Sequence, residues 1–141
     1  MANIVVVGVD GSETARKAAQ TAAQLAFATG SDLHVVTAFE HDDVETVGIG
    51  ADRWLLSAED RARNTADEAA DAARRTVPTV ITSVAIQGRP AEALLAEAER
   101  LDAQVIVVGN RGMQGLGRVL GSVANTVSHR ASCDVYIVKT V

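Results

Sequence analysis

The sequence has one cysteine, few aromatic residues and no long apolar run, and each shortage excludes a class of protein. Because Cys133 is alone, an internal disulfide and a cysteine-based zinc site are excluded, and we expect a packed residue without chemistry. No apolar run approaches the roughly 20 residues that cross a bilayer, so no membrane partner is expected. The first residues lead into an apolar run without a basic segment or cleavage site, which predicts a cytoplasmic protein without an export signal.

Lysine is also scarce, and the positive charge is dispersed. Only Lys17 and Lys139 accompany the arginines, and the net charge is −5. Nucleic-acid binding normally requires a basic stripe, because affinity grows with the number of phosphates neutralised. An aromatic content of 3% leaves few platforms for stacking bases. No nucleic-acid partner is therefore expected.

The 141 residues, of which 48% are hydrophobic, suit a single domain over residues 1–141. Branched apolar runs of strand length alternate with alanine-rich patterns of helical period. This alternation predicts one three-layer α/β domain with a parallel sheet. We expect strands at 4–9, 33–39, 80–86, 105–108 and 134–139, helices from Ser12 to near Gly30 and over 54–76, 90–100 and 122–131, and a loop at 41–52.

Five of the eleven glycines crowd into residues 109–121, between an expected strand and an expected helix. Backbone N–H groups and the helix dipole attract anions at such a place. The segment is longer than the about two to six residues that a plain connection needs. It is not a P-loop, because Arg118 and Val119 stand where lysine and serine or threonine are required, and the glycine spacing does not fit a dinucleotide fingerprint. We predict close approach of this backbone to a negatively charged ligand.

Each polar candidate also has a structural interpretation. Asp10, which ends the first expected strand, is either a turn or capping residue or a ligand contact. Ser122 is expected at or near a helix N-cap with or without a ligand. Arg111 and Arg118 are solvated loop charges or phosphate contacts.

A combination of motifs resembles the universal stress protein family over the whole chain. It consists of Asp10 in VGVDGSE, then Gly109-Asn110-Arg111-Gly112, eight residues, and Gly121-Ser122. The resemblance implies a Rossmann-like, adenine nucleotide alpha hydrolase-like fold with helices on both faces and strand order 3-2-1-4-5. That order places Asp10 beside Gly109 where the strand order reverses, and this is where ligands bind in such sheets.

The resemblance also implies an adenine-nucleotide ligand, with ATP foremost and cyclic AMP or AMP as alternatives, in a stress-response or signalling protein. Asp10 would meet the ribose, and the backbone near Thr37 and Ala38 would border the adenine. Glycines 109, 112 and 121 and Ser122 would hold phosphates. Asp10 and Ser12 are candidate Mg²⁺ ligands. The full expected set is Gly8, Val9, Asp10, Ser12, Thr37, Ala38, Gly109, Asn110, Arg111, Gly112, Gly121, Ser122 and Val123.

One departure from the family pattern concerns the spacing of the glycines. Eight residues, where the family has nine, separate Gly112 from Gly121. A loop shortened by one residue affects the binding of a triphosphate more than the binding of the nucleotide as such. The single phosphate of cyclic AMP needs fewer contacts from this loop. Two further functions stay open: a nucleotide-free dimeric interaction module and a slow ATPase. Efficient hydrolysis is not expected, because a P-loop lysine and a second carboxylate paired with Asp10 are missing.

The last expected strand would lie at an edge of the sheet. Residues 135–138 carry Tyr136 and branched residues, with only Lys139 as a charged guard. An edge of this kind tends to pair with another strand. We therefore expect a homodimer through this strand, and the resemblance implies the same pairing.

Overall fold

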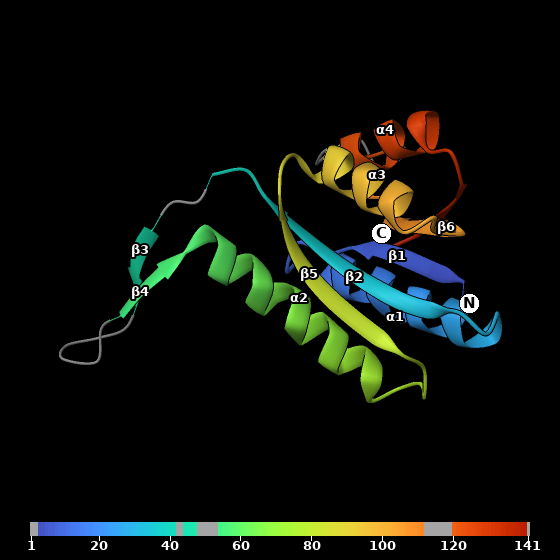
Figure 1. The fold of residues 1–141 in the computed structure, drawn as a ribbon, viewed down its shortest axis with the longest axis horizontal. Coiled ribbons are helices and arrows are strands. Elements are labelled where there is room, and N and C mark those ends of the chain that lie inside the picture. Colours follow the sequence, from blue (N-terminus) through green and yellow to red (C-terminus); the bar gives the residue numbers. More distant parts are fainter. Residues whose placement is uncertain (1–2, 42–43, 48–53, 112–119, 141) are drawn as a thin grey trace.

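The computed structural model describes residues 3–41, 44–47, 54–111 and 120–140. Within these ranges, strands and helices alternate as the sequence predicts, with one hairpin inserted (Figure 1). The elements are β1 (Ile4–Gly8), α1 (Glu13–Ala28), β2 (Asp32–Phe39), β3 (Val44–Val47), β4 (Trp54–Ser57), α2 (Ala58–Arg74), β5 (Ile81–Gln87), α3 (Pro90–Arg100), β6 (Val105–Gly109), α4 (Ser122–Arg130) and β7 (Asp134–Val138).

The main sheet has the order β5-β2-β1-β6-β7, and all of its neighbouring strands are parallel. When β3 and β4 are left out of the count, this is the expected order 3-2-1-4-5, so the prediction is confirmed. Val6 of β1 lies between His34 of β2 and Ile106 of β6. The order reverses at β1, because β2 lies on one side of it and β6 on the other.

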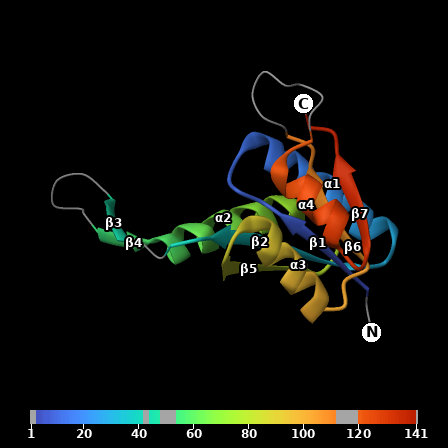
Figure 2. The same cartoon turned by 90° about the horizontal axis from the view of Figure 1, so that it is seen from above.

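Helices cover both faces of this sheet, which makes three layers. Helices α1 and α2 pack on one face, and α3 and α4 on the other (Figures 1 and 2). Successive β1 residues alternate between the two sides: Val5 and Val7 belong to the core under α1 and α2, and Val6 to the core under α3 and α4. All three are fully buried, which explains why the strand sequence is continuously apolar.

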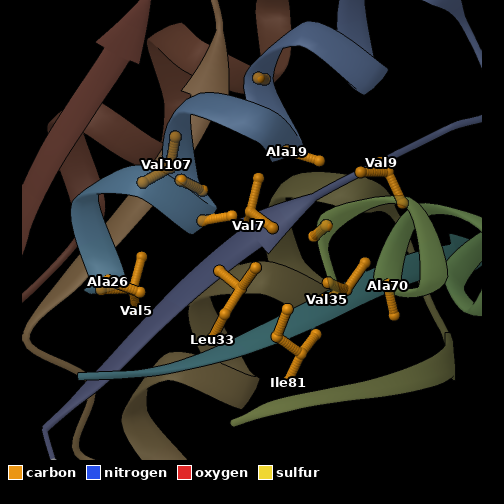
Figure 3. Packing of buried hydrophobic residues seen from close by; sticks show 14 of the residues in the cluster. Val5, Val7, Val9, Ala19, Ala26, Leu33, Val35, Ala70, Ile81 and Val107 are labelled. Carbon is orange, nitrogen blue, oxygen red and sulfur yellow. The ribbon is translucent and has the colours of Figure 1, made fainter. Parts of the chain in front are cut away.

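The core under α1 and α2 is built from valines on the strands and alanines on the helices (Figure 3). Short alanine side chains let a helix lie close to the sheet, and the branched strand residues fill the space between them. The buried alanines of this core are Ala18, Ala19, Ala22, Ala23 and Ala26 on α1 and Ala66, Ala70 and Ala73 on α2.

The predictions for residues 44–47 and 54–57 were wrong. The expected loop contains β3, and the first residues of the expected helix form β4, which pairs antiparallel with β3. Figure 1 shows this hairpin at the start of α2, away from the main sheet. Helix α2 begins only at Ala58, because Ser57 caps it: its hydroxyl accepts the Asp60 N–H, and the Asp60 carboxylate accepts the Ser57 N–H.

The other helix ends agree with the sequence to within two residues. Ser12 caps α1 by accepting the N–H of Ala15, and Gly30 follows α1 with a φ of +65°, as expected of a C-terminal glycine. The N-cap of α4, however, is Gly121, and Ser122 is the first helical residue. Ser122 thus lies next to the N-cap, within the expected position, but the cap residue itself is a glycine.

Cys133 lies half-buried against the core under α3 and α4. Burial raises the pKa of its thiol, and the charge of Asp134 adds to this effect. A raised pKa disfavours the thiolate, in agreement with the expected packing role. None of the described helices combines the length and the apolar character that crossing a membrane requires.

Candidate functional site

A cavity of about 220 Å³ opens at the carboxyl ends of β1 and β6, where the strand order reverses. The turns after these two strands and the first turns of α1, α3 and α4 surround it. In open α/β sheets this position is the usual ligand site. The cavity, called the crevice below, is lined by Gly8, Val9, Asp10, Ser12, Thr14, Ala15, Val36, Ala38, Pro90, Leu94, Val108, Gly109, Arg111, Gly121, Ser122, Val123 and Ala124.

The turn between β1 and α1 sets the position of Asp10. Its Oδ1 accepts the N–H of Ser12 at 3.0 Å, and Gly11 between them has a φ of +86°, a conformation that glycine adopts readily. Asp10 therefore has the turn role that the sequence left open. It also lines the crevice and is exposed, and its Oδ2 accepts no hydrogen bond within the described residues. The structural and the ligand-binding interpretations are thus compatible.

The start of α4 forms the opposite side. Gly121 has φ −61° and ψ 156°, which any residue adopts, so its backbone conformation does not require glycine. No side-chain hydrogen bond caps this helix, although the first N–H groups of a helix lack intrahelical partners. Gly121, Ser122 and Val123 all line the crevice. The crevice is thus bordered by the first N–H groups of α4, which attract anions.

The wall between these polar ends is apolar. Val36 and Ala38 of β2, Val108 of β6 and Leu94 of α3 supply it. A Cβ at Gly8 would lie 2.8 Å from Leu94 Cδ1, so the absence of a side chain there lets α3 pack against β1. Gly8 therefore shapes the crevice through Leu94 as well as lining it.

Ten of the thirteen residues expected from the sequence line the crevice. Thr37 does not, because strand alternation turns it to the face opposite Val36 and Ala38; its Oγ1 is buried without a hydrogen-bond partner in the described structure. Asn110 does not line it either, because its Oδ1 accepts two hydrogen bonds from Thr140. Gly112 and Arg118 lie outside the described residues.

The sequence motifs missed seven lining residues. Pro90 and Leu94 come from α3, whose contribution depends on how that helix crosses the sheet, and no motif encodes this crossing. Pro90 was expected only as the first residue of a helix, which it is. The remaining missed residues adjoin expected ones: Thr14, Ala15, Val36, Val108 and Ala124.

The proposed magnesium ligands do not form a complete metal site by themselves. The Ser12 hydroxyl accepts the Ala15 N–H and shares a hydrogen bond with Thr14 Oγ1. Over the part of the chain that the structure describes, no three His, Cys, Asp or Glu side chains gather as a metal site would require. An ion at Asp10 would need ligands from phosphates or water as well, as Mg²⁺ commonly has.

A second polar cluster lies between α3 and the sheet. Glu97 is only 6% exposed; its Oε2 is 2.7 Å from His34 Nε2, and Arg100 donates to both carboxylate oxygens at 2.7 and 2.8 Å. His34 Nδ1 lies 2.6 Å from Thr82 Oγ1. The hydrogen bonds from Arg100 lower the pKa of Glu97 against the opposing effect of burial, and the bond with His34 lowers it further. This cluster, called the Glu97 cluster, leaves no carboxylate oxygen unpaired.

Comparison with known proteins identifies the family. The model of the universal stress protein family matches residues 1–139. The chain belongs to the universal stress protein family. A universal stress protein of Mycobacterium tuberculosis is 34% identical over 96% of this chain and 95% of its own length. Another, of Thermus aquaticus, is 34% identical over 99% of this chain and its full length.

Solved universal stress proteins share the fold. One, solved in complex with cAMP, superposes with a TM-score of 0.79 and 32% identity, covering 99% of this chain and 98% of its own. The protein of Archaeoglobus fulgidus, solved in complex with dAMP, gives a TM-score of 0.73 and 25% identity over 97% of this chain and 98% of its own. The Rossmann-like class expected from the sequence is confirmed.

Proposed function

We propose that this universal stress protein binds an adenine nucleotide in the crevice. One observation carries the proposal: Asp10 and the uncapped start of α4, more than a hundred residues apart in sequence, line one cavity where the strand order reverses. The solved relatives that hold cAMP and dAMP support the same ligand class.

The lining matches the three parts of a nucleotide. Val36, Ala38 and Leu94 offer apolar surface to a flat base. The free oxygen of Asp10 can accept hydrogen bonds from ribose hydroxyls. The first N–H groups of α4, together with the guanidinium of Arg111, supply positive charge for a phosphate.

The number of phosphates is the finer question. Arg111 is the one cationic side chain among the crevice residues that the structure describes, and the glycine spacing is one residue shorter than the family pattern. Both features suit one phosphate, as in AMP or cyclic AMP. ATP, the ligand that the resemblance implies first, would place more negative charge there and would gain most from Mg²⁺.

Calorimetric titration with ATP, AMP, cyclic AMP and GTP, each with and without Mg²⁺, tests the proposal, together with mass spectrometry of small molecules that co-purify. We expect saturable binding of at least one adenine nucleotide and weaker binding of GTP. If no adenine nucleotide binds at millimolar concentration, the proposal is wrong and the nucleotide-free interaction module is favoured. Phosphate release from ATP, measured in parallel, tests the slow ATPase.

We also propose that β7 pairs with its counterpart in a second copy. It is an edge strand of the described sheet, with Tyr136 45% and Ile137 37% exposed. Unpaired edge strands with apolar side chains favour such addition. Light scattering should give the mass of a dimer, and Tyr136→Lys should shift it toward the monomer. A monomeric wild-type protein at tens of micromolar would contradict the pairing.

A further inference from the structure

Three hydrogen bonds join the residue after β6 to the residues that end and follow β7. The N–H of Asn110 donates to the carbonyl of Val138 at 2.9 Å. Asn110 Oδ1 in turn accepts the Thr140 N–H at 2.8 Å and the Thr140 hydroxyl at 3.1 Å. A Cβ at Gly109 would lie 3.4 Å from Thr140 Cγ2, so Thr140 also packs beside that glycine. This arrangement is called the Asn110–Thr140 clamp.

The clamp lies just behind the crevice. Gly109 and Arg111 line the crevice, whereas Asn110 between them and Thr140 do not. Asn110 therefore holds the chain at the point where it leaves β6. Because its only side-chain oxygen is engaged with Thr140, the direction of the backbone toward Arg111 depends on a residue next to the edge strand.

We infer that Thr140 is a positioning residue for the phosphate side of the crevice and acts through Asn110. The inference rests on the proposed function. Donors that hold an anion are effective only when their backbone is fixed before the ligand arrives, since ordering them on binding costs affinity. Asn110, which the sequence suggested as a ligand contact, thus supports its neighbours Gly109 and Arg111.

The test compares AMP with adenosine, which lacks the phosphate. Thr140→Val removes the hydroxyl and keeps the backbone N–H bond, Thr140→Ser restores the hydroxyl, and Asn110→Ala removes the acceptor of both bonds. Thr79→Val is the matched control, because it also removes a threonine hydroxyl that donates to an amide oxygen, here the backbone carbonyl of Ser31, at 2.8 Å. Thr79 and Ser31 precede their strands, so they lie at the opposite end of the sheet.

The dissociation constants of both ligands and the melting temperature are measured for every variant. We expect Thr140→Val to raise the dissociation constant of AMP about fivefold, the ratio that corresponds to one hydrogen bond of ordinary strength. Adenosine affinity should be unchanged in Thr140→Val, and Thr140→Ser should restore AMP binding. Asn110→Ala should weaken AMP binding at least as much. In the double variant, Thr140→Val should have little effect on AMP binding beyond that of Asn110→Ala.

The outcomes separate the two proposals. If wild-type protein binds AMP and Thr140→Val keeps the wild-type ratio of AMP to adenosine affinity, the positioning role is wrong and the proposed function stands. Equal weakening of both ligands also overturns it, because that result indicates a general loss of structure. If the wild-type protein binds neither AMP nor any other adenine nucleotide, the proposed function fails and the inference fails with it.

Discussion

The crevice and the Glu97 cluster both contain a carboxylate beside the sheet, but they use it in opposite ways. Glu97 is almost buried, and each of its oxygens has at least one charged or hydrogen-bonding partner. Asp10 is exposed and gives one oxygen to a turn, while the uncapped start of α4 faces the same cavity. A satisfied cluster stabilises the fold, whereas polar groups left partly free in a cavity are suited to a ligand.

The largest effect is expected from Glu97→Ala. Removing the carboxylate leaves His34 without a partner at Nε2 and frees Arg100, which should lower the free energy of unfolding by about 2 kcal/mol. Urea denaturation measures this. Glu99→Ala, an exposed glutamate on the same helix, is the control and should change stability by less than about 0.5 kcal/mol. Equal losses in the two variants would refute a special role for the Glu97 cluster.

Asp10→Asn should lower nucleotide affinity and leave stability nearly unchanged, whereas the effect of Glu97→Ala is on stability. Asparagine can keep the turn, because its Oδ1 also accepts the Ser12 N–H, but the charge that faces the ligand is lost. We expect nucleotide affinity to fall about tenfold, as for a lost charge-assisted hydrogen bond, with stability nearly unchanged. Asp134→Asn, at the amino end of β7, should leave affinity at the wild-type value. If Asp10→Asn binds the nucleotide as tightly as wild type does, the Asp10 carboxylate does not contribute to the site.

Gly8→Ala probes the wall that the crevice shares with the core. The new Cβ would meet Leu94 Cδ1 at 2.8 Å, so the side chain or α3 must shift, which should cost about 1 kcal/mol of stability. Leu94→Ala removes the obstacle, and adding Gly8→Ala to it should cost less than Gly8→Ala does alone. Denaturation of the two single variants and the double variant measures the coupling. Additive losses would show that the contact with Leu94 is not the cause.

The smallest effect concerns pH. The pKa of Glu97 is held below its ordinary value of 4.5 in the folded protein, chiefly by Arg100. A lowered pKa contributes stability above the unfolded value of 4.5, and this contribution is lost as the pH falls toward the folded pKa. The stability advantage of wild type over Glu97→Gln should therefore be nearly constant at pH values well above 4.5 and should shrink as the pH is lowered below about 4.5. An advantage independent of pH would contradict this account.

Much of this architecture could be predicted from the sequence, because its signals are local. Buried strands such as β1 read as continuous apolar runs, and Ser12 and Gly30 mark the ends of α1. The strand order came from the family resemblance, since periodicity does not encode it. Once the order is given, Asp10 and Gly121 fall into one crevice.

What the sequence did not predict has two physical causes, which are short strands and contacts between residues far apart in the chain. The paired strands β3 and β4 have four residues each, which is too few for a periodic signal. Leu94 lines the crevice beside Gly8, which is far from it in sequence. The hydrogen bonds of the Asn110 side-chain oxygen to Thr140, thirty residues later, are likewise not encoded in the motif that contains Asn110.

The position of Glu97 one turn after Leu94 on α3 has an evolutionary consequence. The anchor of this helix lies apart from the surface that a bound molecule touches, since Leu94 lines the crevice and Glu97 does not. Substitutions at the apolar wall can therefore change which base is accepted while the helix keeps its attachment. Since Leu94 also belongs to the buried core, such substitutions preserve the fold best when they keep the volume of the side chain.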